Sequence, residues 1–291
     1  MKKIVFILNP KAGHGLNRHI EEKIDTVFQG NDFSINKVYT EYSGHATVLS
    51  RNAASENYYA AVAIGGDGTV NEVAAGLVNS NTAIGIIPMG SGNGISNILK
   101  IPHNVEKALT IIKTGRPETI DSFTVNGRFG INVTGAGFDA FVAHQFAHAG
   151  KRGFVTYIKL VMKSYFGYKE QEFEFEIDGE KFKRKAFLAE IANGAEFGNR
   201  AVIAAPALAD DGWLDVVIIR KTNLFNLPFT LYRIFSGSML GRKVAEYYRG
   251  KRIVIRSASD MYIHVDGEAA GQATKAEVLM VPGSVKVITG I

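Results

Sequence analysis

The chain contains no cysteine among its 291 residues. This absence excludes disulfide bonds, a thiolate nucleophile and a cysteine-ligated metal, and it fits a reducing compartment such as the cytoplasm. No apolar run approaches the roughly 20 residues that a helix needs to cross a bilayer. The sequence therefore predicts a cytoplasmic protein, with any membrane contact being peripheral and on the inner face.

Charge of either sign is moderate, because 33 basic and 28 acidic residues leave a formal net charge of +5. A small positive excess is compatible with phosphorylated ligands, an anionic membrane or nucleic acid, and equally with solubility alone. The chain lacks a P-loop lysine motif, a protein-kinase catalytic loop and a nucleophile elbow. Glycine, in contrast, is abundant at 31 residues, which points to tight turns or close contacts between backbone and ligand.

The N-terminal part of the chain alternates apolar runs with segments of helical spacing. We expect strands at 4–8, 33–40, 61–64 and 83–88, and helices at 16–28, 45–54 and 70–78. This rhythm predicts an α/β domain with a mostly parallel sheet and helices on both faces. In such sheets, ligands bind beyond the carboxyl ends of the strands.

From about residue 122 the pattern changes to short strands and hairpins. Asn-Gly at 126–127 and Asp-Gly at 178–179 are hairpin signals. Strands are expected at 172–177, 180–191, 213–219, 252–256, 262–265, 277–281 and 285–288, and helices at 154–166 and 224–240. We predict an α/β domain over residues 1–122 and a mostly antiparallel β domain, interrupted by helices, over 123–282. The last residues, about 283–291, are expected to pack back on the first domain.

One segment of the first domain combines an apolar strand, a glycine turn and a helix. Residues 61–64 lead into Gly65-Gly66-Asp67-Gly68-Thr69, and Glu72 is expected in the first helical turn. Glycine amides and the free donors of a helix N-terminus can cradle phosphates. Because phosphates repel a carboxylate, we expect Asp67 to hold Mg²⁺ or to accept a proton.

Two further glycine-rich turns are expected at the same edge of the sheet. Residues 9–15 offer Lys11 as a counter-charge for phosphate, and residues 90–94 offer the hydroxyl group of Ser91. Thr40 ends a neighbouring strand. Each of these features is also compatible with an ordinary turn or strand end.

Residues 65–69, followed by Asn71 and Glu72, resemble the nucleotide loop of the diacylglycerol kinase catalytic family, which includes bacterial lipid kinases and sphingosine kinases. The same pentapeptide occurs in NAD kinases. Segments 132–140, 205–207, 211–216 and 265–268 resemble, in order, the second domain of the lipid kinases, and the NAD kinase signature is absent. The Gly-Ser-Gly-Asn segment around Ser91 is similar to the sphingosine kinase version, which does not by itself identify sphingosine as the substrate.

The resemblance implies an ATP-dependent lipid kinase that uses Mg²⁺. The implied nucleotide-binding residues are Asn9, Lys11, Gly13, Thr40, Gly65, Gly66, Asp67, Gly68, Thr69, Asn71, Glu72 and Ser91. It also implies a structural Mg²⁺ held by Asp211 with the carbonyl groups of Leu208 and Trp213. From the residues alone, an Asp-Gly turn that needs no metal is the favoured interpretation of this segment.

The Asp-Gly-Glu triplet occurs twice, and one copy is expected to be catalytic. Residues 178–180 form a predicted hairpin tip, whereas Glu268 occupies the family's position for the base that accepts the proton of the lipid hydroxyl group. Asp67 is the alternative base. The sequence does not decide between the two.

The resemblance implies a lipid partner at a membrane surface and no nucleic-acid partner. Segments 157–166 and 224–235 are apolar with basic neighbours, which suits either an interfacial helix or a core helix. The preferred substrate is a diacylglycerol-like lipid. A sphingoid base, another lipid, a soluble hydroxyl compound such as NAD, and a binding module without catalysis are the alternatives. The oligomeric state stays open, with a dimer among the options.

Overall fold

The computed structural model describes residues 1–13, 18–30, 32–149, 154–197, 201–202, 204, 207–222, 229 and 244–290. The chain divides into two compact units, one formed by Met1–Asp121 with Gly283–Ile291 and the other by Ser122–Pro282. Two strands, β5 (Arg116–Val125) and β16 (Glu268–Thr289), contribute residues to both units.

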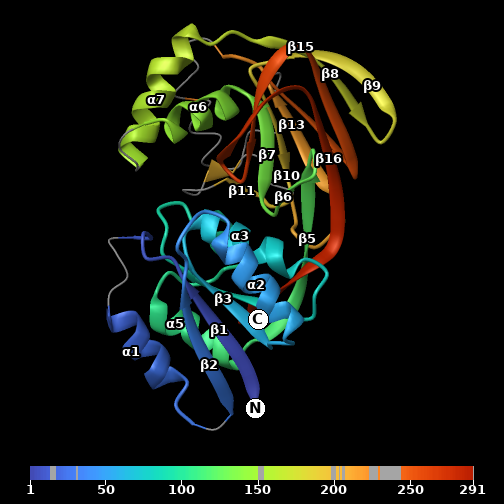
Figure 1. The fold of residues 1–291 in the computed structure, drawn as a ribbon. Coiled ribbons are helices and arrows are strands. Elements are labelled where there is room, and N and C mark those ends of the chain that lie inside the picture. The colour runs from blue at the N-terminus through green and yellow to red at the C-terminus, as the bar shows by residue number, and fades with distance from the viewer. Residues whose placement is uncertain are drawn as a thin grey trace. The chain divides into compact units, whose positions relative to one another are not determined.

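The first unit is built on a parallel sheet in the order β2–β1–β3–β4, and the last part of β16 runs parallel to β4 (Figure 1). The strands are β1 (Lys2–Leu8), β2 (Phe33–Tyr39), β3 (Ala60–Gly65) and β4 (Ala83–Pro88). Every residue of β3 and β4 is buried, so helices cover both faces of the sheet. The predicted α/β architecture is therefore confirmed.

The helices of this unit pack in two pairs, α1 (Arg18–Val27) with α5 (Val105–Thr114), and α2 (His45–Ser55) with α3 (Asp67–Leu77). A short helix, α4 (Gly94–Ile98), follows β4. The predicted start of the first helix lies outside the described residues. The prediction for α3 was wrong by three residues, because the helix begins at Asp67 and Glu72 lies beyond its first turn.

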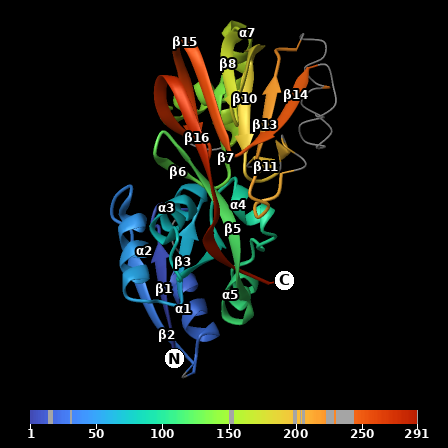
Figure 2. The same ribbon diagram turned by 90° about the vertical axis from the view of Figure 1, so that its right-hand side faces the viewer.

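The second unit is a mostly antiparallel sheet in the order β14–β13–β10–β7–β15–β16 (Figure 2). Strand β8 pairs with β15, β9 with β8, and β5 with β6 and β16. The bounds are β6 (Arg128–Gly130), β7 (Val133–Gly137), β8 (Gln171–Ile177), β9 (Glu180–Ala186), β10 (Leu188–Ala192), β13 (Leu214–Ile219), β14 (Ala245–Gly250) and β15 (Arg252–Val265), with β11 (Glu196–Phe197) and β12 (Ala201–Val202) forming a separate pair. The predicted class of this domain is confirmed.

Several strand boundaries differ from the sequence prediction. The expected strand at 180–191 is two strands, because β9 pairs with β8 whereas β10 pairs with β7 and β13. Phe187, between them, is buried in an aromatic cluster against the helices. Conversely, the segments expected at 252–256 and 262–265 form the single strand β15, whose pairing with β16 carries register shifts.

Two described helices interrupt the strands of the second unit. Helices α6 (Phe138–Ala147) and α7 (Phe154–Gly167) lie side by side and share a core that includes Phe138, Val142 and Tyr165 (Figure 1). The helix expected at 224–240 lies outside the described residues. Among the residues that the structure does describe, no helix combines the length and apolar character needed to cross a membrane.

Candidate functional site

Three glycine-containing loops of the first unit meet at the carboxyl ends of its parallel strands. The amide of Met89 donates to the carbonyl oxygen of Gly65 at 2.8 Å. A Cβ atom on Gly90 would lie 2.7 Å from the Cα of Gly66, and one on Gly13 would lie 3.4 Å from the carbonyl oxygen of Met89. The loops after β3 and β4 therefore touch backbone to backbone, which requires glycine at this contact.

Asn9 ties the loop after β1 to the loop after β3. Its Nδ2 donates to Oγ1 of Thr69 at 2.9 Å, and its Oδ1 accepts the backbone amide of Lys11 at 3.0 Å. Thr69 is buried, and a Cβ atom on Gly65 would collide with its side chain. The side chains of Asn9 and Thr69 thus hold the two loops together, while Lys11 is exposed beside them.

Asp67 occupies the first turn of α3, directly after the glycine turn. The preceding residue, Gly66, is extended and supplies no side-chain cap, and Asp67 and Gly68 are half-buried. The partial positive charge of a helix N-terminus stabilises a carboxylate and also attracts phosphate. The start of α3 can therefore hold an anion, with a cation beside Asp67 to balance its charge. Asn71 lies on the same helix.

The carboxylate of Glu72 is engaged elsewhere. Its Oε1 accepts the amide of Gly44 at 2.8 Å and its Oε2 accepts the amide of Ala46 at 3.2 Å. Glu72 thus satisfies donors at the N-terminus of α2 and fixes that helix against α3. Thr40 follows β2, and its amide donates to the carbonyl oxygen of Leu8 at 2.9 Å.

The third loop is closed by Asn93, which the sequence analysis did not single out. Its Oδ1 accepts the amide of Gly90 at 2.9 Å and its Nδ2 donates to the carbonyl oxygen of Gly90 at 2.8 Å. Asn93 has a positive φ of 50°, and Ser91 is exposed at the tip of the turn. The available signal was an asparagine just before a helix, where αL backbone is tolerated.

A pocket of about 760 Å³ adjoins these loops. Gly13, Gly90 and Asn93 contribute polar backbone and amide groups to its lining, and Ile20 and Val105 contribute apolar surface. Small-molecule sites commonly combine apolar walls with a few polar groups. A small molecule that enters this pocket would lie next to the glycine loops.

In the second unit, Asp266 and Glu268 have different surroundings. The carboxylate of Asp266 accepts the backbone amides of Ile131, Asn132 and Val133 at 3.1, 2.9 and 2.9 Å. The side chain of Glu268 is 62% exposed, with its Oε2 3.6 Å from Nη2 of Arg128. Asp266 therefore anchors the turn, and Glu268 is the carboxylate presented to solvent.

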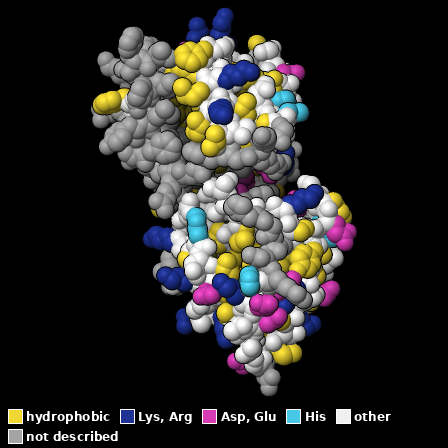
Figure 3. Space-filling view, turned by 90° about the vertical axis from the view of Figure 1, so that its left-hand side faces the viewer, with side chains coloured by type: hydrophobic (Ala, Val, Ile, Leu, Met, Phe, Trp, Pro, Cys, Tyr) yellow, Lys and Arg dark blue, Asp and Glu magenta, His cyan; other side chains and the backbone are white. Residues whose placement is uncertain are grey.

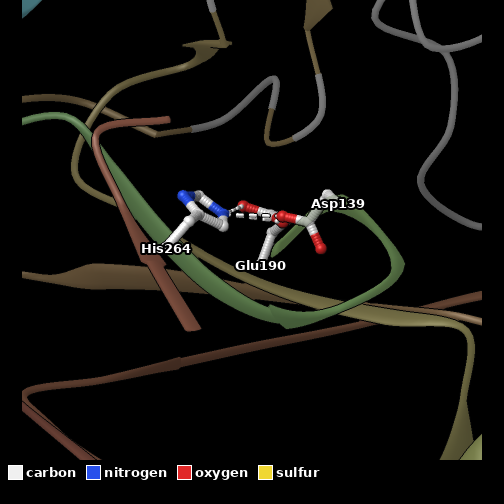
Figure 4. Close-up of side chains that lie close together, drawn as sticks. All are labelled: Asp139, Glu190 and His264. Atoms are coloured by element: carbon white, nitrogen blue, oxygen red, sulfur yellow. Dashed lines mark hydrogen bonds and ion pairs between the residues drawn. The ribbon is translucent and has the colours of Figure 1, made fainter. Parts of the chain in front are cut away.

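Beneath this turn lies a buried cluster of Asp139, Glu190 and His264 (Figure 4). They come from the first turn of α6, from β10 and from β15, and their side chains are 11%, 0% and 1% exposed. Nε2 of His264 lies 2.6 Å from Oδ2 of Asp139 and 3.3 Å from Oε2 of Glu190. These residue types bind metals, and they also form proton-sharing networks.

Burial and mutual charge shift the pKa values of all three groups. Burial, together with the charge of Asp139, raises the pKa of Glu190 well above its usual range. Burial opposes ionisation of Asp139, but the charge of His264 and hydrogen bonds from Glu190 and His264 lower its pKa. Burial likewise disfavours a charged His264, yet the charges of Glu190 and Asp139 raise its pKa to about 10. Desolvation and charge pairing thus compete throughout the cluster.

Asp211, the predicted ligand of a structural Mg²⁺, is paired with a basic side chain. Its Oδ2 contacts Nη2 of Arg249, and its Oδ1 accepts the amide of Trp213 at 3.1 Å. Nε of Arg249 also lies 3.3 Å from Oδ1 of the fully buried Asp215. Leu208 is exposed. Because a guanidinium group occupies the carboxylate, this arrangement does not fit Mg²⁺ unless Arg249 moves away.

Comparison with known proteins finds two family matches in succession. Residues 3–125 match the diacylglycerol kinase catalytic domain, and residues 132–289 match the YegS C-terminal NAD kinase beta sandwich-like domain. A diacylglycerol kinase of Staphylococcus carnosus (strain TM300) is 28% identical over 276 residues, covering 93% of this chain and 90% of the relative. A diacylglycerol kinase of Staphylococcus aureus (strain JH9) is 28% identical over 277 residues, covering 93% and 87%.

Solved structures share the fold. A diacylglycerol kinase from Bacillus anthracis str. Sterne superposes with a TM-score of 0.75 at 20% identity, covering 99% of this chain and 97% of that chain. A candidate diacylglycerol kinase from the same organism gives a TM-score of 0.80 at 22% identity, with the same coverage. At these identities the likeness concerns the fold alone.

Proposed function

Since the chain belongs to the diacylglycerol kinase catalytic-domain family, a family of lipid kinases, we propose that it transfers the γ-phosphate of ATP to the hydroxyl group of a diacylglycerol-like lipid. The observation that carries the proposal is the convergence of three glycine loops on the N-terminus of α3 in the first unit. The loops supply backbone donors for the phosphates, and the adjoining pocket supplies space for the nucleoside.

Asp67 and Glu268 are the two proposed catalytic carboxylates. Mg²⁺ bound with ATP would neutralise phosphate charge, and Asp67, at the glycine turn, has the oxygen ligands that this ion prefers. Glu268 is an exposed carboxylate directly after a hairpin turn. Among the described residues no backbone amide donates to its side chain, in contrast to that of Asp266. We propose Glu268 as the base for the lipid hydroxyl group and Asp67 as the residue that organises charge at the phosphates. Phosphoryl transfer depends mainly on such placement and charge neutralisation.

The test is incubation of the purified protein with Mg²⁺, labelled ATP and total-lipid fractions, followed by mass identification of the product. A phosphorylated diacylglycerol supports the proposal, whereas a phosphorylated sphingoid base or NAD would replace the substrate. ATP-induced thermal stabilisation without phosphate transfer to any acceptor would indicate a binding module instead.

Matched variants test the assignment of the base. Glu268→Gln and Asp67→Asn are expected to lower turnover by about 10²–10⁴-fold while the protein stays folded. Glu180→Gln is the control, because Glu180 ends the other Asp-Gly-Glu triplet and is also exposed. Full activity in both Glu268→Gln and Asp67→Asn would refute the assignment.

Helix α7 offers a surface for reaching the lipid. Val155, Ile158, Met162 and Phe166 are 67%, 40%, 46% and 62% exposed. They recur at helical spacing, so one face of α7 is apolar and solvent-exposed although Tyr165 packs into the core. Figure 3 views the side of the molecule on which α7 lies, where apolar side chains surround basic ones.

We propose that this face of α7 lies on the surface of an anionic bilayer without crossing it. Lys159 and Lys163 are exposed on α7, and the helix contains no acidic residue. An apolar stripe with adjacent lysines suits an interfacial helix. Each lysine near an anionic surface contributes about 1 kcal/mol, so Lys159→Gln with Lys163→Gln should weaken vesicle binding by roughly 30-fold at low salt.

Cosedimentation with vesicles that contain anionic phospholipid measures this binding. Met162→Ser with Phe166→Ser should also weaken it, whereas Val48→Ser, at a 42% exposed position on α2, serves as the control. Equal sedimentation of all variants would reject α7 as the contact. Arg242 and Lys243, two of the basic neighbours of the segment 224–235, are also expected to contribute to membrane binding, but they lie outside the described residues.

A further inference from the structure

The two Asp-Gly-Glu triplets form nearly identical turns. Each joins two antiparallel strands through two residues, with φ of 48° and 97° at Asp178 and Gly179, and 50° and 79° at Asp266 and Gly267. Each aspartate accepts backbone amides of a neighbouring strand or loop. The local geometry therefore does not distinguish the second triplet from the first. Any difference between the two turns comes from the residues packed beneath them.

The difference is the residue two positions before the aspartate. In the first hairpin it is Glu176, which forms ion pairs with the partly exposed Arg252 and Arg256. In the second it is the buried His264, whose Nδ1 accepts the amide of Gly267 at 3.3 Å. Of these two described turns, only the second therefore has a side chain, that of His264, that accepts a hydrogen bond from the amide of its glycine.

The other nitrogen of the ring faces the two carboxyl groups. Nε2 of His264 lies 2.6 Å from Oδ2 of Asp139, and Oγ1 of Thr134 donates to the carbonyl oxygen of His264 at 2.6 Å. Since Nδ1 accepts an amide, the ring proton belongs on Nε2, whose hydrogen-bond partner is Oε1 of Glu190 at 3.3 Å. The imidazole ring therefore joins the Gly267 N–H to Glu190, with Oδ2 of Asp139 2.6 Å from the same Nε2. Figure 4 shows the ring and the two carboxyl groups.

This arrangement favours a proton network over a metal site. A metal on Nε2 would require a proton on Nδ1, which would then face the Gly267 N–H. Two ligands of a tetrahedral ion, each about 2 Å from it, lie roughly 3.3 Å apart. The 2.6 Å between Nε2 and Oδ2 of Asp139 is shorter than this, whereas the 3.3 Å between Nε2 and Oε2 of Glu190 equals it.

The charge of Glu190 is the largest of the influences that raise the pKa of His264, and burial in turn raises the pKa of Glu190 itself. The shifts therefore belong to the cluster as a coupled group. The contact of Nδ1 with the Gly267 amide, rather than these shifts, assigns the ring proton to Nε2.

We propose that His264, oriented by Asp139 and Glu190, is a positioning residue that fixes the Gly267 amide and through it the direction of Glu268. The consequence for turnover rests on the proposed role of Glu268 as the base. A two-residue turn transmits a displacement of Gly267 directly to Glu268, the next residue and the first of β16. A misplacement of about 1 Å can cost as much as about 100-fold in rate.

Direct observation of the ring tests the proposal without any enzyme assay. Nitrogen-15 NMR of the histidine side chains at neutral pH, assigned with His264→Gln, should show His264 protonated on Nε2 alone. A doubly protonated ring would overturn the proposal. So would a bound metal, detected by elemental analysis of the purified protein and lost in Glu190→Gln.

Hydrogen exchange at the two glycines supplies an internal control. When a glutamine at position 264 places its amide donor near Asp139, its acceptor oxygen lies on the same terminal carbon and not at the position of Nδ1. In His264→Gln, the Gly267 amide should exchange roughly 2- to 10-fold faster, corresponding to one lost hydrogen bond, while the Gly179 amide is unchanged. Equal changes at both glycines would mean general loosening and would refute the proposal.

Kinetics complete the test. His264→Gln should lower kcat with little change in the KM for ATP, and Glu190→Gln, which replaces a carboxyl group by an amide of similar shape, should keep the Gly267 amide protected. If His264→Gln frees the Gly267 amide but leaves kcat unchanged, the link from the turn to Glu268 is wrong. If no acceptor is phosphorylated by the wild-type protein, the proposed function fails, and the NMR and exchange results still decide the role of His264.

Discussion

The contact between the loops after β3 and β4 yields a graded prediction for nucleotide binding. A Cβ atom on Gly90 would lie 2.7 Å from the Cα of Gly66, and a Cβ atom on Gly66 would lie 3.2 Å from the Cα of Gly90. Ordinary van der Waals contact begins at 3.4 Å, so the overlap is larger for the first substitution than for the second. The opposing atoms are backbone, which has no rotamer with which to move aside.

Gly90→Ala should therefore push the two loops apart by several tenths of an ångström. Overpacking of this kind typically costs about 1–3 kcal/mol, part of which would be lost from ATP binding because the same loops are proposed to donate to the phosphates. We expect ATP affinity to fall by roughly 5- to 100-fold in Gly90→Ala and by less in Gly66→Ala. Gly167→Ala is the control, because nothing lies within 4 Å of the added carbon.

Isothermal titration calorimetry with a non-hydrolysable ATP analogue and Mg²⁺ measures this affinity, and circular dichroism shows whether each variant is folded. The order expected is wild type and Gly167→Ala tightest, then Gly66→Ala, then Gly90→Ala. Wild-type affinity in a folded Gly90→Ala would mean that the loops do not bind the phosphates, and the proposed nucleotide site would be wrong.

Three further predictions concern single side chains. Glu72→Ala removes the acceptor of two amides at the start of α2 and should destabilise the protein by about 0.5–2 kcal/mol, measured by urea unfolding; an unchanged midpoint would contradict the capping role. Because Arg249 pairs with the carboxylate of Asp211, Mg²⁺ should raise the Tm of Arg249→Gln but not that of the nucleotide-free wild type. A Tm that Mg²⁺ raises in the wild type and not in Arg249→Gln would instead support Asp211 as a Mg²⁺ ligand. Arg252 and Arg256 lower the pKa of Glu176, so its ion pairs stabilise the fold above the ordinary pKa of 4.5, and this stabilisation is lost as the pH falls through the lowered pKa. The difference in Tm between wild type and Glu176→Gln should therefore vanish in acid. A difference in Tm that persists in acid would exclude a charge effect.

The parallel sheet of the first unit was predictable because its strands are short apolar runs. Residues on both faces of β3 and β4 are buried, and strands of this kind appear in the sequence as unbroken hydrophobic segments. The start of α3 was less predictable, because glycine, aspartate and threonine have weak helix propensity. Tertiary contacts of the glycine turn, rather than propensity, start this helix at Asp67.

The second unit shows where pattern reasoning fails. The residues 180–191 read as one strand, yet β9 and β10 have different partners, and pairing between distant segments leaves no local signal. The same limit applies to the site. Asp139 falls in the motif segment 132–140 and His264 in the strand expected at 262–265, whereas Glu190 sits in an apolar strand, and only the fold brings it to the other two.

The paired triplets show why a motif does not assign chemistry by itself. Residues 178–180 and 266–268 share sequence, turn type and backbone dihedral angles, so local structure follows from local sequence in both. Their surroundings diverge two residues earlier, where Glu176 faces partly exposed arginines and His264 faces buried carboxyl groups. A partly exposed ion pair contributes little, whereas burying a titratable cluster carries a desolvation cost that other interactions must offset. The second hairpin carries that cost next to the proposed base, and this favours the second triplet over the first for the proposed role in catalysis.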